Sequence, residues 1–281
     1  MQLDDPFVAI PPGKLDYDLT TFFPLFSTYI YKLCSDLDSI RFSTLKVLAD
    51  FEADGVIYLE LRTTPRAIPQ HNITKQKYVE TVLDCIEKYE LDPEHRLHTG
   101  LILSVDRRNT LEQANEVVEL AKAFHNRGVC AVDLCGDPAR IPIDHLAPAF
   151  EKARKAGLKV TLHFAEAPVS SSDKELWMLL SWQPDRLGHV INVHDELKRD
   201  IVKREIGVEL CLSCNTDDVG VFCSPLSQEY ALAAKHFNLS KEDLVTLCEG
   251  VAEMTFAGED EKARLRRVYK MLRKELDRTR A

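Results

Sequence analysis

A short apolar run near the middle of the chain ends in residues that can bind a metal and move a proton. The run is LKVTLHFAE (158–166), in which His163 and Glu166 lie three residues apart. Imidazole is a common zinc ligand, and a carboxyl group can act as a general acid or base. Further along, His189 ends the segment DRLGH, and Asp217–Asp218 lie in CNTDDVGVF. Three such sites in chain order favour a catalytic centre over isolated structural histidines.

Six apolar segments rich in Val, Ile and Leu supply the strands that must position these residues. Near-continuous hydrophobicity is expected of parallel strands that are buried on both faces. The stretches between them are predicted to be amphipathic helices, such as TLEQANEVVELAKAF, which starts with a capping box of Thr110 and Gln113 and stops before Gly128. The strand segments are 55–66, 97–108, 129–138, 158–168, 185–193 and 207–215.

The alternation of strand and helix predicts an α/β fold with a parallel sheet and right-handed crossovers. Periodicity alone fits both a closed barrel and an open doubly wound sheet. No GxGxxG or Walker-type glycine loop follows a strand, which removes the usual nucleotide-binding reason for an open sheet. Polar residues end all six segments, and a TIM-type (β/α) barrel builds its active site at these ends. We therefore predict one barrel domain over residues 1–281.

Composition argues against several classes of protein. The net charge of −9 disfavours a nucleic-acid-binding surface, which would need clustered Lys and Arg. No apolar run approaches the ~20 residues of a membrane span, and the acidic N-terminus is unlike a secretory signal. Cys85, Cys130, Cys211 and Cys248 fit apolar patterns as reduced thiols. Cys211 and Cys214 also have CxxC spacing, but without a second ligand pair. We expect a cytoplasmic monomer without a nucleic-acid or membrane partner.

Taken together and in order, these segments resemble the adenosine/AMP deaminase family of metal-dependent hydrolases. The motifs that carry the resemblance are DGVIYLELRTTPR, VDRR, VDLCGDP, HxxE at 163–166, RLGH, VELCLSCN, TDDVGVF and LSQEYALAA. Within that family the chain looks most like the subgroup that acts on N6-substituted AMP. The resemblance implies a (β/α)8 barrel, one zinc ion and hydrolytic deamination of a purine nucleoside or nucleotide.

The resemblance also implies a role for each matching position. His163 and Asp217 would be zinc ligands. Glu166 would protonate the purine at N1, and His189 would orient and deprotonate the attacking water. Asp218 would accept a hydrogen bond from that water or from the purine. The remaining positions would contact the substrate: Thr63, Thr64, Pro65, Arg66, Asp106 and Gly136.

Arginines at the strand ends favour a nucleotide over a nucleoside. Arg66, with Arg107 and Arg108, could bind a 5′-phosphate, because a guanidinium fork engages phosphate bidentately. A small-molecule purine nucleotide is therefore the expected ligand, and N6-methyl-AMP, converted to IMP, is the expected substrate. On sequence alone, Arg107 and Arg108 also fit solvated surface charge. Glu166 also fits a helix cap, and Asp217–Asp218 also fit a polar turn.

Two parts of the family pattern are missing. The family opens with an HxH strand end that supplies two zinc ligands, whereas the first histidine of this chain is His71. A catalytic zinc usually has three protein ligands, so a chain with only His163 and Asp217 is expected to bind zinc weakly or not at all. Between Asn215 and Thr216 two strand ends adjoin directly, although a crossover between parallel strands needs roughly a dozen residues.

The sequence therefore predicts an incomplete barrel, truncated at its N-terminus and between residues 215 and 216, with six full strands. The leading hypothesis is a zinc-dependent purine aminohydrolase in which this particular chain is inactive. One alternative is a non-catalytic purine-nucleotide-binding or regulatory protein. Another is a CxxC redox or metal-binding protein based on Cys211 and Cys214.

Overall fold

A computed structural model describes residues 4–280 apart from 12–13, 15–16, 141, 211–220 and 222–224. Its centre is one sheet of six parallel strands in which each strand pairs with the next along the chain. Each strand lies within one of the six predicted segments, which confirms the predicted α/β class. The strands are β1 (Tyr58–Thr63), β2 (His98–Asp106), β3 (Val129–Cys135), β4 (Lys159–Phe164), β5 (Arg186–His189) and β6 (Gly207–Glu209).

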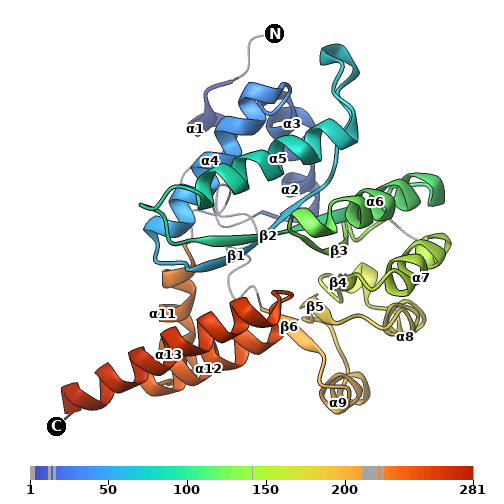
Figure 1. Ribbon diagram of the computed structural model, residues 1–281. Coiled ribbons are helices and arrows are strands. Elements are labelled where there is room, and N and C mark those ends of the chain that lie inside the picture. Colours follow the sequence, from blue (N-terminus) through green and yellow to red (C-terminus); the bar gives the residue numbers. More distant parts are fainter. Residues whose placement is uncertain are drawn as a thin grey trace.

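The sheet curls from β1 round to β6 as about half of a barrel, with a layer of helices on its outer face (Figure 1). Side-chain caps set several helix starts: Thr110 and Gln113 form the predicted capping box. The outer helices are α4 (Leu37–Ala53), α5 (Lys75–Glu90), α6 (Leu111–Ala123), α7 (Ala147–Lys155), α8 (Asp173–Ser181) and α9 (Asp195–Lys203). Short 3-10 turns occur at Pro69–His71, His125–Arg127, Asp144–Leu146 and Pro168–Ser170.

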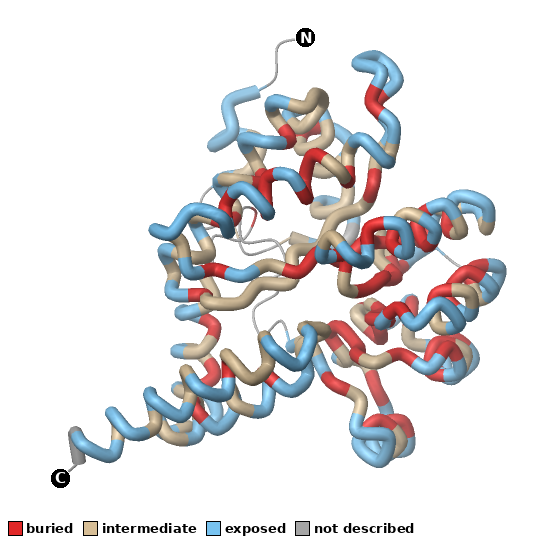
Figure 2. Tube along the Cα trace, in the orientation of Figure 1, coloured by how far each residue is buried: buried red, intermediate tan, exposed pale blue. Residues whose placement is uncertain are grey.

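The hydrophobic core lies between the sheet and this outer layer, where Figure 2 shows buried residues along the inner sides of the helices. Leu101, Leu103 and Val105 of β2 are fully buried, as are Val117 and Val118 of α6. Parallel strands covered on both faces bury such runs throughout their length. The continuous apolar segments of the sequence therefore become the centre of the sheet.

Helices at both ends of the chain extend this framework. The N-terminal segment forms α1 (Pro6–Ala9), α2 (Leu19–Leu25), a π-helix η1 (Phe26–Ile30) and α3 (Tyr31–Leu33), while the C-terminal segment forms α11 (Leu226–Phe237), α12 (Lys241–Met254) and α13 (Glu259–Arg280). The last two pack side by side (Figure 1). In the described part of the chain, no helix has the length and apolar character to cross a membrane.

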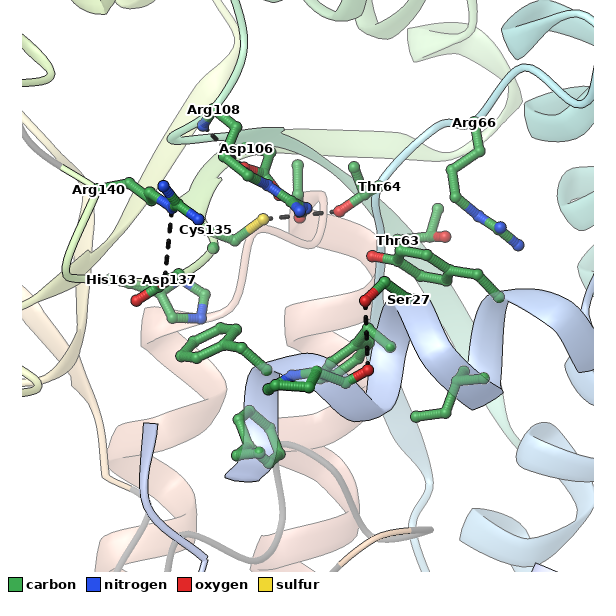
Figure 3. A pocket seen from close by; sticks show the side chains of 18 of the residues that line it. Ser27, Thr63, Thr64, Arg66, Asp106, Arg108, Cys135, Asp137, Arg140 and His163 are labelled. Atoms are coloured by element: carbon green, nitrogen blue, oxygen red, sulfur yellow. Dashed lines mark hydrogen bonds and ion pairs between the residues drawn. The ribbon is translucent and has the colours of Figure 1, made fainter. Parts of the chain in front are cut away.

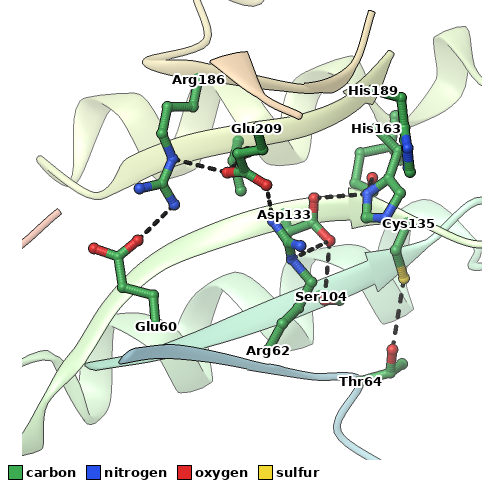
Figure 4. Close-up of polar contacts among 12 residues, drawn as sticks. Glu60, Arg62, Thr64, Ser104, Asp133, Cys135, His163, Arg186, His189 and Glu209 are labelled. Atoms are coloured by element: carbon green, nitrogen blue, oxygen red, sulfur yellow. Dashed lines mark hydrogen bonds and ion pairs between the residues drawn. The ribbon is translucent and has the colours of Figure 1, made fainter. Parts of the chain in front are cut away.

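The concave side of the sheet carries charged residues that pair across its interior. We call Glu60, Arg62, Asp133, Arg186 and Glu209 the interior network (Figure 4). Arg62 of β1 lies 2.7 Å from Glu209 of β6, and Arg186 of β5 lies 2.6 Å from Glu60 of β1. Arg186 also reaches Glu209 at 2.8 Å. Ion pairs thus join the first strand to the fifth and sixth, although the backbone hydrogen bonds of the sheet do not.

On the opposite side of β1, Glu52 of α4 connects three parts of the chain. Its carboxylate accepts hydrogen bonds from the Tyr89 hydroxyl (2.6 Å) and from the backbone N–H of Arg96 (2.5 Å), and His95 Nδ1 lies 2.7 Å away. Burial raises the pKa of Glu52, but these hydrogen bonds outweigh it and lower the pKa to about 2. The carboxylate therefore holds the start of β2 against α4 and α5.

We predict that Glu52→Gln lowers the free energy of unfolding by about 1–3 kcal/mol at pH 7, because hydrogen bonds to a charged acceptor are lost. The group's pKa is depressed in the folded chain, so its contribution is complete above its ordinary pKa and disappears as the pH falls towards 2. Urea unfolding at pH 7 and pH 3 measures this. An equal difference between the variant and the parent at both pH values would contradict the assigned role.

Candidate active site

A cavity of about 590 Å³ opens at the carboxyl ends of the strands, where a barrel of this kind builds its site. Figure 3 shows the N-terminal helical segment running along one side of it. Aromatic residues of that segment, among them Phe22, Phe26 and Tyr31, form this wall. The strand ends supply the opposite wall with residues predicted from the sequence: Thr63, Thr64, Arg66, Asp106, Gly136, His163 and Glu166.

His163, near the end of β4, is held by its Nδ1 atom. That nitrogen lies 2.8 Å from the carbonyl oxygen of Leu134 and 3.1 Å from Asp133 Oδ1. A carbonyl oxygen can only accept, so Nδ1 is the protonated nitrogen and Nε2 of the neutral ring keeps its lone pair. This tautomer suits a metal ligand, and a carboxylate behind the imidazole is the usual support for one.

Glu166 and His189 lie beside His163. His189 Nε2 is 4.0 Å from Glu166 Oε2, and the His163 and His189 rings are 5.2 Å apart between centroids. His189 is buried and Glu166 is partly exposed to the cavity. The structure therefore brings together His163, Glu166 and His189, which the sequence analysis assigned to metal binding, to protonation and to water activation. Their roles remain predictions.

The backbone that carries these residues is strained. Ala165, His189 and Val190 have φ angles of 51°, 66° and 56°, the left-handed region that β-branched residues in particular avoid. Asn192 supports this conformation, because its backbone N–H donates to Ala165 O (2.9 Å) and its side chain to Glu166 O (3.2 Å). Such strain gathers at functional sites, where packing fixes an unusual geometry.

The predicted substrate-contact residues divide into two groups. Thr63 and Thr64 line the cavity, and Thr63 Oγ1 lies 2.8 Å from the Tyr78 hydroxyl. Pro65 is buried and is not part of the cavity lining, and neither is His189. Substrate contact by Thr63, Thr64 and Pro65 stays a prediction.

Asp106 and Gly136 form a pair. A Cβ atom at Gly136, where φ is +99°, would lie 2.9 Å from the Asp106 carboxylate, so only glycine leaves room for that carboxylate. Asp106 in turn accepts hydrogen bonds from Arg108, from Nε at 2.8 Å and from Nη2 at 2.6 Å. Gly136 thus packs against Asp106, and the Arg108 charge is neutralised beside the cavity.

Arg107 has a different position from the one predicted. It is 4% exposed and its Nη1 donates to Glu175 Oε1 at 2.8 Å, which ties the end of β2 to α8. The prediction that Arg107 helps to bind phosphate is wrong, and so is the alternative of a solvated surface charge. The arginines that line the cavity are Arg62, Arg66, Arg108 and Arg140, and Arg62 is paired with Asp133 and Glu209.

Of the two predicted zinc ligands, only His163 lies among the described residues. In the ranges that the structure describes, no group of three His, Cys, Asp or Glu side chains is placed to hold a metal ion. Asp217 and Asp218 lie outside the described residues, as do Cys211 and Cys214 of the CxxC pair. His163 has a suitable tautomer, but by itself it is not a zinc site. Weak or absent zinc binding therefore stays a prediction.

Sequence reasoning missed the interior network below His163. Asp133 bridges His163 to Arg62, whose Nε lies 3.2 Å from Asp133 Oδ2 (Figure 4). Burial raises the pKa of Glu209, but the charges of Arg62 and Arg186 outweigh it and lower that pKa to about 2. The spacing in YLELRT was a usable signal, because Glu60 and Arg62 alternate with leucines and so share one face of the strand.

Comparison with known proteins gives a consistent result. The family model described as "Adenosine deaminase" matches residues 13–215. N6-Methyl-AMP deaminase of Danio rerio is 35% identical over 283 residues, covering 88% of this chain and 80% of the relative. The Homo sapiens protein of the same name is 34% identical over 310 residues, covering 97% and 86%. Because this chain has 281 residues, at least 29 positions of the second alignment have no counterpart in it.

Solved structures agree with the sequence relatives. The structure described as the ADAL–IMP complex has a TM-score of 0.89 at 32% identity, covering 96% of this chain and 87% of that one. Arabidopsis ADAL complexed with GMP gives 0.88 at 32%, covering 95% and 86%. A Burkholderia amidohydrolase with bound Zn gives 0.79 at 18% identity, covering 98% and 87%, which supports the fold alone.

We predict that Arg62→Met lowers the free energy of unfolding by about 3–5 kcal/mol at pH 7, because the buried Asp133 and the partly buried Glu209 lose a partner. The loss should be smaller at pH 5, since a carboxyl that takes up a proton tolerates burial without a cation. Arg127→Met is the control. It breaks a partly exposed pair with Asp84 and Glu87 and should cost about 0–1 kcal/mol. Chemical denaturation of both variants at the two pH values measures these losses. Equally small losses of unfolding free energy in Arg62→Met and Arg127→Met would contradict a stabilising role of the interior network.

Proposed function

Because this chain belongs to the adenosine deaminase family, we propose that its cavity binds a purine nucleoside 5′-monophosphate. We further propose that the chemistry of this site is hydrolysis of N6-methyl-AMP to IMP. The observation that carries the proposal is one cavity that holds Arg66 together with His163 and Glu166. Relatives named N6-methyl-AMP deaminase and solved relatives with IMP or GMP support the same class of ligand.

The charges along the cavity wall support one orientation of the nucleotide. Arg108 is paired with Asp106, and Arg140 lies 3.6 Å from Asp137. Arg66 has no carboxylate within ion-pair distance among the described residues, and in Figure 3 it lies on the opposite side of the cavity from His163. An unneutralised guanidinium attracts a phosphate most strongly. We therefore place the phosphate at Arg66 and the purine towards His163 and Glu166.

The proposed chemistry assigns the proton transfers to two polar residues near the base. Water adds to C6 of the purine while Glu166 delivers a proton to N1, which offsets the charge that develops on the ring. His189 accepts a proton from the water and gives it to the amine nitrogen as the C6–N bond breaks and methylamine leaves. The hydroxyl proton of the adduct returns to Glu166 as the C6=O bond of IMP forms. A carboxyl group and an imidazole with contacts between them are the usual partners for such acid–base work.

We also propose that the 281-residue chain as it stands does not turn over this substrate. It has no histidine before His71, and its alignment with the Homo sapiens relative leaves at least 29 positions of that alignment unmatched. A protein that keeps the nucleotide pocket and lacks the full set of metal ligands would bind purine nucleotides without hydrolysing them. The competing assignment is the active hydrolase, and metal content separates the two.

We predict that the purified chain releases no measurable methylamine from N6-methyl-AMP and no ammonia from AMP. Zinc measured by atomic emission should be well below one ion per chain, because a stable catalytic site needs about three protein ligands. The same chain with the unmatched segments restored from its genomic locus is the control, and it should gain zinc and activity together. Product release by the 281-residue chain that a chelator abolishes would overturn the assignment.

We predict that Arg66→Ala weakens N6-methyl-AMP binding by roughly 10- to 100-fold, the effect of losing charge-assisted hydrogen bonds. Binding of N6-methyladenosine, which has no phosphate, should change by less than about 2-fold. Arg140→Ala, which removes another cavity arginine, is the matched control and should have a smaller effect. Isothermal titration calorimetry measures all of these. Equal losses for nucleotide and nucleoside would contradict the phosphate assignment.

A further inference from the structure

We propose that Tyr31 is a specificity-determining residue, which positions the guanidinium of Arg66 and so gives the cavity its preference for a 5′-monophosphate. This inference rests on the proposed function above. It adds the segment that holds Arg66 in place for a phosphate: the short helix α3 and the residue that follows it. This segment lies outside the strands and contains none of the family motifs named above.

The contact geometry places Arg66 against this segment twice. The guanidinium carbon lies 4.3 Å from the centroid of the Tyr31 ring, within the range of a cation–π interaction. Arg66 Nη2 donates to the carbonyl oxygen of Cys34 at 2.6 Å. A flexible side chain fixed by a ring face and a carbonyl has lost most of its freedom before any ligand arrives, and such preorganisation favours binding.

A second ring flanks the same guanidinium at a greater distance. Tyr78 of α5 lies 5.8 Å from the Arg66 guanidinium carbon, near the limit for a cation–π contact. Its hydroxyl is engaged with Thr63 Oγ1 at 2.8 Å, which fixes the ring beside the end of β1. The closer Tyr31 ring is therefore the main aromatic contact of the Arg66 guanidinium.

Among the described residues, this arrangement holds the charge of Arg66 without a carboxylate that would neutralise it. A guanidinium has five N–H donors, and Cys34 takes one of them in the described structure. Aromatic rings and a carbonyl attract the cation but contribute no full negative charge, unlike the carboxylate of Asp106 beside Arg108. The remaining donors and the net charge are available to a phosphate. A purely structural arginine would be expected to have a carboxylate partner, as Arg107 has in Glu175.

The test compares Tyr31→Leu and Tyr31→Phe by calorimetry with N6-methyl-AMP and N6-methyladenosine. Tyr31→Leu removes the ring face and should weaken nucleotide binding by roughly 5- to 30-fold, while nucleoside binding changes by less than about 2-fold. Tyr31→Phe keeps the ring and should stay close to the parent. In an Arg66→Ala background, Tyr31→Leu should cause no further loss, because both changes remove one interaction.

The outcomes separate this inference from the proposed function. If the parent chain binds nucleotide and nucleoside equally, the proposed function fails and the inference fails with it. If Arg66→Ala abolishes the preference and Tyr31→Leu keeps it, only the inference is overturned. An equal loss for both ligands in Tyr31→Leu also overturns it, because that pattern reports a structural role. Should Tyr31→Leu not fold, Tyr31→Met provides the same test, since it removes the ring face and keeps a long apolar side chain.

Discussion

The ion pairs inside the curled sheet are the constraint on which the rest of the structure depends. Burying a charge is costly unless a partner of opposite sign is well placed, and the interior network meets this condition only when β1 lies opposite β5 and β6. Glu209 keeps its pKa near 2 because Arg62 and Arg186 both reach it. The charged state of the interior residues therefore depends on the curvature of the sheet, because flattening the sheet would separate these ion pairs.

The network also determines the chemistry available at the strand ends. Asp133 receives Arg62 on one oxygen and faces His163 Nδ1 with the other (Figure 4). This contact and the Leu134 carbonyl fix the ring so that its Nε2 keeps a lone pair. The left-handed backbone at Ala165 and His189 costs free energy, and a rigid sheet can sustain it. The strands thus both orient the His163 ring and hold the strained backbone at Ala165 and His189.

The sequence predicted the parts of this structure that depend on local patterns. Continuous apolar runs located all six strands, and the Thr110–Gln113 box located a helix start. Contacts between distant elements were not predictable in the same way. Arg107 and Arg108 are neighbours, yet one turns to Glu175 and the other to Asp106. Which side chain at a strand end faces the cavity depends on how helices from elsewhere in the chain pack there. Local sequence patterns do not show those contacts.

The cavity separates recognition from chemistry, because the two ends use different elements. Arg66 with Tyr31 and Cys34 belongs to the end of β1 and the N-terminal helical segment, whereas His163 and Glu166 belong to β4 and the residues that follow it. Sites with no shared partners contribute to binding almost independently. Under the proposed function, a change at the His163 end would therefore alter turnover without altering the proposed phosphate contact at Arg66, because the two ends share no residue.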